Sequence, residues 1–96
     1  MIKVTVKTIL GMDKYLGNKL SQEIELKENS TVKELISIMA NIYGESIISL
    51  LLTEDNTPKR GIAMFLNGRN IFARDGLKTI LKDRDEFLIF PPVGGG

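Results

Sequence analysis

The residues best suited to chemistry in this sequence are its last six, Pro91, Pro92, Val93, Gly94, Gly95 and Gly96. If Gly96 ends the chain, its α-carboxylate sits on a stretch of backbone without side chains. A carboxylate becomes an acyl donor once its oxygen is converted into a leaving group, which ATP does by forming an acyl-adenylate. A sulfur, nitrogen or oxygen nucleophile can then take the acyl group. Because glycine has no Cβ, a narrow active site can close around such a segment.

Two prolines separate this tail from an apolar strand. Pro91 and Pro92 have no N–H and a fixed φ, so the strand cannot continue through them and the chain leaves in an extended form. Fully extended, residues 91–96 reach about 20 Å from the domain. Glycine-rich ends are also commonly frayed, but prolines set between a strand and glycines favour a functional tail. We therefore predict a domain over residues 1–90, a flexible tail over residues 91–96 and Gly96 as the reactive residue.

Side-chain catalysis finds little support elsewhere. The sequence contains no Cys and no His, which excludes disulfides, thiolate nucleophiles, Cys/His zinc sites and imidazole acid–base chemistry. Acidic residues cluster at 54–55 and 83–86, in predicted turns, with a spacing that fits no calcium loop. No glycine-rich phosphate-binding motif occurs. We expect no metal site and no bound cofactor.

Composition limits the partners. The 96 residues suffice for one domain with a single core, and the formal net charge is +1. No basic block is present, so no nucleic-acid partner is expected. No apolar run is long enough to span a bilayer, so no membrane association is expected. Together with the missing cysteines, these features predict a cytoplasmic domain.

The first elements that must position the tail are two strands and a helix. Residues 2–7 and 21–27 alternate apolar with polar side chains, which predicts two half-buried strands that pair antiparallel. Thr31 and Glu34 fit a capping box at a helix start, and Gly44 fits a helix stop. Between them lies one apolar stripe of helical spacing, formed by Val32, Leu35, Ile36, Met39, Ile42 and Tyr43.

The second half of the chain completes the sheet. Residues 45–52 suit a short second helix, and residues 62–66 and 69–72 form a hairpin around Asn67-Gly68. Residues 75–81 predict a helical turn that places Leu77, Ile80 and Leu81 inward. The last strand, residues 86–90, carries four consecutive apolar residues, which is typical of a central strand.

One helix covers only one face of a sheet. If Leu88 and Phe90 face the helix, Phe87 and Ile89 lie on the opposite face and form a candidate partner surface, because exposed apolar patches commonly bind partners. Alternatively, the loops over residues 11–20 and 45–61 cover that face. The sequence leaves both interpretations open.

At these residues the sequence resembles the ubiquitin-like sulfur carriers of the MoaD/ThiS type, and most closely the small subunits of molybdopterin synthase. The run over residues 81–93 is similar to that family's "L-x-(D)-G-D-E-V-x-x-F-P-P-V", with Arg84 where the family usually has Gly. Gly95 and Gly96 match its terminal diglycine. Residues 31–35 resemble its T-V-x-x-L helix start, and residues 65–68 its strand and turn.

The resemblance implies an α+β fold of the β-grasp (ubiquitin-like) class. Such a fold has a mixed sheet of about five strands, with the first and last strands parallel in the centre and one main helix crossing it. The order of the elements predicted above agrees with this fold.

The resemblance also implies a function and partners. An adenylating enzyme of the ubiquitin-activating type would use ATP to adenylate Gly96, and a sulfur donor system would convert it to a thiocarboxylate. Residues 91–95 would insert with it into the large subunit of molybdopterin synthase, which builds the molybdenum or tungsten cofactor. The chain would then be a non-catalytic small subunit and cosubstrate. Alternatives are a protein modifier joined through Gly96 to target lysines, or a sulfur carrier for thiamine synthesis or tRNA thiolation.

Overall fold

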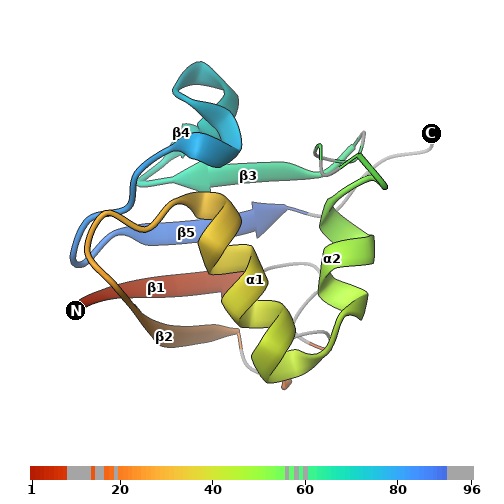
Figure 1. Ribbon diagram of the computed structural model, residues 1–96, viewed down its shortest axis with the longest axis horizontal. Helices are drawn as coiled ribbons and strands as arrows, with labels where there is room; N and C mark the ends of the chain where they lie inside the picture. The colour runs from red at the N-terminus through yellow and green to blue at the C-terminus, as the bar shows by residue number, and fades with distance from the viewer. Residues whose placement is uncertain are drawn as a thin grey trace.

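The computed structural model describes residues 1–8, 14, 17, 18, 20–55, 57, 59 and 61–90. Their strands form one five-stranded sheet in the order β2-β1-β5-β3-β4. The bounds are β1 (Ile2–Thr8), β2 (Ser21–Leu26), β3 (Ala63–Leu66), β4 (Arg69–Asn70) and β5 (Glu86–Phe90). β1 and β5 lie parallel and side by side inside the sheet, whereas the other neighbours are antiparallel (Figure 1). The predicted α+β fold with a mixed sheet is confirmed.

Helix α1 (Val32–Tyr43) crosses one face of the sheet (Figure 1). Its predicted capping box is present: the Glu34 N–H donates to Thr31 Oγ1 at 3.3 Å, and the Thr31 N–H donates to Glu34 Oε1 at 3.2 Å. These bonds satisfy two N–H groups that the helix itself cannot pair. The side chains that α1 buries are Val32, Leu35, Ile36, Met39 and Ala40.

The prediction that Ile42 is buried was wrong, since 56% of this residue is exposed. At 3.6 residues per turn it lies on the flank of the apolar stripe, in the last turn of the helix. The predicted second helix is confirmed as α2 (Ser46–Leu51), which buries Ile47 and Leu51. Within the described residues, neither helix is long and apolar enough to cross a membrane.

The hairpin between β3 and β4 turns at Asn67 and Gly68, both of which have positive φ, +52° and +83°. This backbone matches the twist of the flanking strands and suits Asn-Gly. The return strand is short, because a 3-10 turn (Ile71–Ala73) follows directly. A second 3-10 turn (Gly76–Lys78) leads towards β5.

Ile80 was predicted to point inward but is 50% exposed. The helical turn ends before it, and Ile80 forms an isolated antiparallel bridge with Thr31. Extended backbone sends successive side chains to opposite sides. Thr79 and Leu81 are therefore buried, and Ile80 between them faces outward.

The predicted orientation of β5 was also wrong. Phe87 and Ile89 are 0% and 1% exposed and belong to the core, whereas Leu88 and Phe90 lie half-buried on the opposite face. Four apolar residues in a row carry no alternation from which the faces can be assigned. Pairing decides the orientation: Phe87 lies beside buried Val6 of β1, and paired residues of neighbouring strands share a face.

Candidate functional site

The predicted reactive tail lies outside the described residues. It comprises Pro91, Pro92, Val93, Gly94, Gly95 and Gly96. The description ends at Phe90, the last residue of β5, and β5 is held by β1 on one side and by β3 on the other. Whatever the tail does, it starts from the end of an internal strand that pairs along both edges.

A polar network fixes the other end of β5. Asn67 Nδ2 donates to Asp85 Oδ1 at 2.8 Å, and the Glu86 N–H donates to Asn67 Oδ1 at 2.9 Å. The Lys82 N–H donates to Asp85 Oδ2 at 2.8 Å. Because Asp85 is only 9% exposed, its carboxylate oxygens need partners inside the protein, and these bonds give each oxygen one. This network joins the turn of the β3–β4 hairpin to the start of β5.

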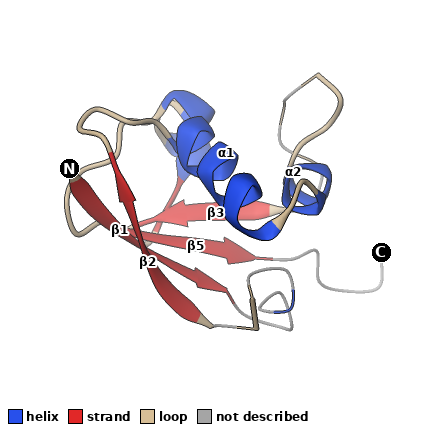
Figure 2. Ribbon diagram, turned by 60° about the horizontal axis from the view of Figure 1, so that its bottom comes forward, coloured by secondary structure: helices blue, strands red, loops and turns tan. Residues whose placement is uncertain are grey.

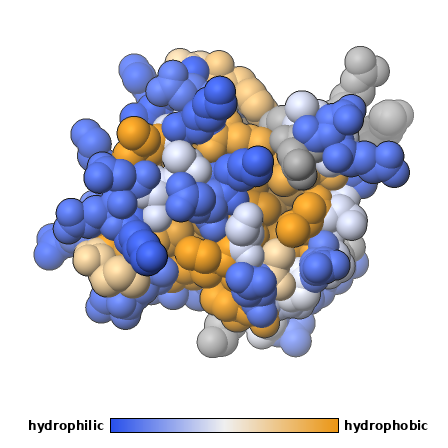
Figure 3. Space-filling model, in the orientation of Figure 1, coloured by the Kyte–Doolittle hydropathy of each residue, from blue (hydrophilic) through white to orange (hydrophobic). Residues whose placement is uncertain are grey.

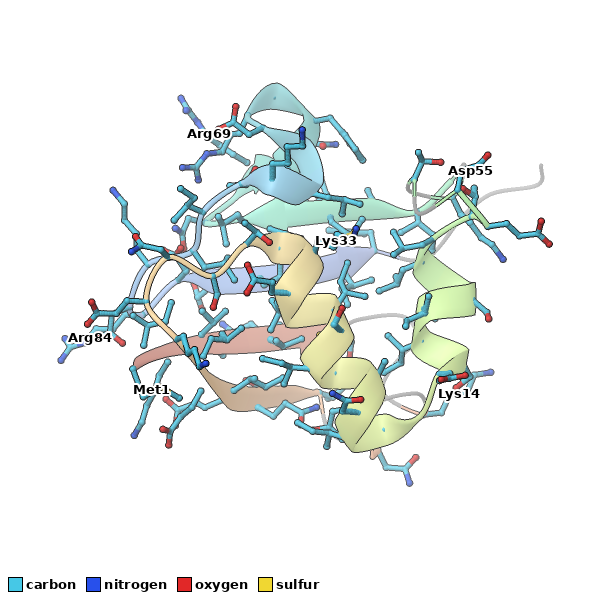
Figure 4. All side chains as sticks on the ribbon, in the orientation of Figure 1. Met1, Lys14, Lys33, Asp55, Arg69 and Arg84 are labelled. Carbon is cyan, nitrogen blue, oxygen red and sulfur yellow. The ribbon has the colours of Figure 1, made fainter. Side chains whose placement is uncertain are left out.

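A second set of bonds joins the turn before β5, at Asp83 and Arg84, to β1. The Lys3 N–H donates to Asp83 Oδ1 at 2.8 Å, and the Arg84 N–H donates to the Lys3 carbonyl at 2.7 Å. The turn needs a left-handed backbone at Arg84, where φ is +69°. Glycine adopts this conformation without penalty, whereas a residue with a side chain is strained there. The Arg84 side chain is 93% exposed and projects away from the domain (Figure 4).

The face of the sheet opposite the helices carries an apolar patch that includes the last residue of β5. Both helices lie on one side of the sheet (Figure 2). On the other side, Phe65, Leu88 and Phe90 are half-buried, and the Phe65 and Phe90 rings meet edge to face with centroids 5.3 Å apart. A shallow hollow there is lined by the residues that we call the open-face patch: Lys7, Phe65, Gly68, Glu86, Leu88 and Phe90.

Charged groups border this patch. Lys7 Nζ and Glu86 Oε1 are 2.5 Å apart, with side chains 46% and 54% exposed. An ion pair this exposed contributes at most about 1 kcal/mol to stability. An apolar centre with a charged border is the usual composition of a protein-binding surface.

The predicted partner surface is therefore corrected from Phe87 and Ile89 to the open-face patch. The sequence predicted an apolar surface on β5, but assigned it to the face that the structure buries. It also missed Phe65, which joins the patch because β3 pairs with β5 and places Phe65 opposite Leu88. The alternative was that residues 11–20 and 45–61 cover this face. Helix α2 does not, because it lies on the side of α1 (Figure 2), and most of residues 11–20 lie outside the described residues.

The described residues offer no metal-binding cluster of three or more acidic side chains. The acidic groups at the start of β5 are engaged in backbone and amide hydrogen bonds instead. The arrangement thus presents an internal strand that directly precedes the tail in sequence, and on it an apolar surface on which a partner can dock.

Comparison with known proteins finds likeness to sulfur carriers and to a small archaeal modifier protein. The sequence profile of the ThiS family matches residues 9–96. A relative from Archaeoglobus fulgidus, named as a candidate sulfur carrier protein, is 36% identical over 69 residues, which cover 72% of this chain and 77% of the relative. Small archaeal modifier protein 3 from Haloferax volcanii is 42% identical over 45 residues, which cover 47% of this chain and 49% of that protein.

A solved structure from Pyrococcus furiosus, described as a candidate molybdopterin converting factor subunit 1, has the same fold. The two share 28% identity with a TM-score of 0.75, and the alignment covers 97% of this chain and 100% of that one. The predicted β-grasp fold is confirmed by this likeness together with the strand order.

Proposed function

Because the chain belongs to the ThiS family of ubiquitin-like sulfur carriers, we propose that it carries sulfur as a thiocarboxylate on Gly96 for the synthesis of molybdopterin. The observation that carries the proposal is the continuity of three features: an internal strand, the Pro91-Pro92 exit and a terminal run of glycines. The chain supplies the acyl group, and its partners supply the catalytic side chains.

The chemistry proceeds in two steps. A carboxylate oxygen of Gly96 attacks the α-phosphorus of ATP, and pyrophosphate leaves. A sulfur nucleophile then attacks the acyl carbon, and AMP leaves with the electron pair of the C–O bond. Hydrosulfide gives the thiocarboxylate directly, whereas a persulfide donor gives an acyl disulfide that a thiol must reduce. ATP is bound by the activating enzyme, and this chain binds no cofactor of its own.

Three partners follow from this scheme: an adenylating enzyme of the ubiquitin-activating type, a sulfur donor system and the large subunit of molybdopterin synthase. Both enzymes must receive Gly96 in a narrow active site, so each needs a docking surface close to the base of the tail. The open-face patch fits this need, because Phe90 belongs to it and directly precedes Pro91. We propose the cytoplasm as the location, where ATP is available.

Molybdopterin synthesis is the proposed pathway for two reasons. Residues 90–93 carry the Phe-Pro-Pro-Val run that resembles molybdopterin synthase small subunits, and the Pyrococcus furiosus structure described as a candidate converting factor subunit has the same fold. Thiamine carriers are usually shorter and lack Pro-Pro-Val, so thiamine synthesis fits less well. A tRNA is an alternative sulfur acceptor, which would use the same carrier chemistry.

Mass spectrometry of the intact protein tests the carrier proposal. Incubation with an adenylating enzyme, ATP and a sulfur donor should replace one oxygen by one sulfur, and the change should map to Gly96. A chain truncated before Gly95 is the control and should keep its mass. An unchanged full-length chain with every cognate activating enzyme would falsify the proposal. Transfer of the sulfur to a pterin precursor by the large subunit tests the pathway separately.

A second candidate function is covalent modification of proteins. It is favoured by the similarity to small archaeal modifier protein 3 from Haloferax volcanii. The same acyl-adenylate would then react with a lysine amine of a target and give an isopeptide bond. Tagged protein in adducts that resist reductant and boiling would indicate this function, whereas thiocarboxylate without such adducts would indicate a dedicated sulfur carrier.

A further inference from the structure

The structure points to a second interaction surface, at the outer edge of β2, the strand farthest from β4 in the sheet. We propose that the free edge of β2, together with the groove between β2 and α1, binds an extended segment of a partner protein in which apolar residues alternate with lysine or arginine. The inference rests on which backbone groups β2 leaves unpaired, on the groove beside them and on the charges that border them. It does not depend on the carrier chemistry of Gly96.

The backbone of β2 has one paired and one unpaired side. β2 is the last strand of the sheet on its side. The Lys3 carbonyl and the Thr5 N–H bond to residues 84 and 85. The backbone N–H and C=O groups of the odd residues of β1 therefore point towards β5, and those of its even residues point towards β2. Since Ile24 pairs opposite Val4, the N–H and C=O of Ile24 face β1. Those of Glu23 and Glu25 therefore point out of the sheet.

No described residue pairs with these outward groups of Glu23 and Glu25. An unpaired strand edge is a template on which another strand can add. The edge is also accessible, because both side chains are exposed.

A groove runs along this edge on the side of α1. Its walls are the end of β2 and the outer face of α1, and its volume is about 410 Å³. Ile38, which is half-buried, supplies apolar surface, and Met1, which is 72% exposed, lies beside it. Hydrophobic surface reaches the exterior between α1 and β2 (Figure 3). Every second side chain of an added strand would enter this groove, which favours aliphatic residues at those positions.

The remaining side chains of an added strand would lie on the open face beside Glu23 and Glu25. Opposite charges on neighbouring strands stabilise the pairing and like charges destabilise it. A second copy of β2 would set its own glutamates beside these, so the edge disfavours pairing with itself. A segment with lysine or arginine at these positions is complementary.

The protein already contains an example of such a strand. β1 pairs with the inner side of β2, and it alternates buried Ile2, Val4 and Val6 with more exposed polar residues. Lys3 of β1 lies directly opposite Glu25. The proposed partner repeats this pattern on the outer side of β2.

An NMR titration of the ¹⁵N-labelled full-length chain tests the proposal. The probe is a peptide that copies residues 2–8, and its control carries glutamate in place of both lysines. The lysine peptide should shift the amides of Glu23, Glu25 and Ile38 and slow hydrogen exchange at Glu23 and Glu25. The glutamate peptide should bind at least about tenfold more weakly.

Charge reversal makes the test specific. The double variant Glu23→Lys, Glu25→Lys should prefer the glutamate peptide, whereas Glu28→Lys, the same change in the exposed turn after β2, should keep the original preference. Such an inversion cannot arise from a simple loss of stability. Equal binding of both peptides, shifts confined to the open-face patch, or displacement of β1 by the peptide would each overturn the proposal.

Discussion

Asn67 and Asp85, 18 positions apart in the sequence, are joined by a 2.8 Å hydrogen bond from the Asn67 amide to a carboxylate oxygen that is largely removed from solvent. The same Asn67 side chain accepts a bond from the Glu86 N–H. One residue of the β3–β4 turn thus sets where β5 begins. This contact therefore helps to fix the strand that directly precedes the tail in sequence.

Replacing Asn67 by Gly should destabilise the fold by about 1–3 kcal/mol, because the Asp85 carboxylate and the Glu86 N–H lose a partner. Glycine tolerates the positive φ of this position, so the change isolates the side-chain bonds from the backbone conformation. Urea unfolding followed by circular dichroism measures the loss. An unchanged urea midpoint for Asn67→Gly would mean that the backbone of the turn, without the Asn67 side-chain bonds, is enough to hold the start of β5.

Replacing Arg84 by Gly should raise the free energy of unfolding by up to about 1 kcal/mol. The residue has a φ of +69°, where a side chain is strained and glycine is not. The matched control is Arg74→Gly, at an exposed arginine with a φ of −123°, which should destabilise instead. Chemical denaturation of both variants gives the comparison, and a loss of stability in both would contradict the role assigned to the turn.

Leu35→Ala should cost about 2–5 kcal/mol, because Leu35 is fully buried between α1 and the sheet and its removal leaves a cavity. Ile42→Ala in the same helix should cost far less, since that residue is 56% exposed. Thermal and urea unfolding of the pair check the orientation of the helix. Similar losses in both variants would mean that the helix is rotated from its described position.

Leu88→Ala should weaken docking of the activating enzyme while leaving the tail intact. Truncating a central apolar contact of an interface costs on the order of 1–2 kcal/mol, so the KM for this chain should rise about tenfold with little change in kcat. ATP–pyrophosphate exchange with the activating enzyme measures both constants. Ile80→Ala, at an exposed apolar residue outside the open-face patch, is the control and should behave as the unmodified chain does.

Gly95→Ala should leave stability unchanged and impair activation or insertion of the tail. The added methyl group must fit an active site that closes around a backbone without side chains. Intact-mass analysis after incubation with the activating system and sulfur donor measures loading, and urea unfolding checks the fold. Normal loading and normal sulfur transfer would argue against steric selection of glycine.

Local patterns in the sequence predicted most elements of the fold. The capping residues Thr31 and Glu34 marked the start of α1, and Asn67-Gly68 marked the hairpin, because each of these signals acts through bonds between residues close in the chain. The prolines and glycines at positions 91–96 likewise indicated the acyl chemistry through their own backbone properties. These residues needed no information from the rest of the molecule.

Tertiary structure decided the faces and edges. The run from Phe87 to Phe90 is apolar on both sides, so only its pairing with β1 and β3 shows that Leu88 and Phe90 face outward. The same pairing brings Phe65 to the open-face patch, and among the described residues the strand order leaves the outer edge of β2 without a partner strand. These properties come from contacts between residues far apart in sequence, for which local periodicity holds no information. The sequence by itself therefore determined the elements of the fold and predicted the chemistry of the glycine tail, and the tertiary structure determined which surfaces lie beside the last strand.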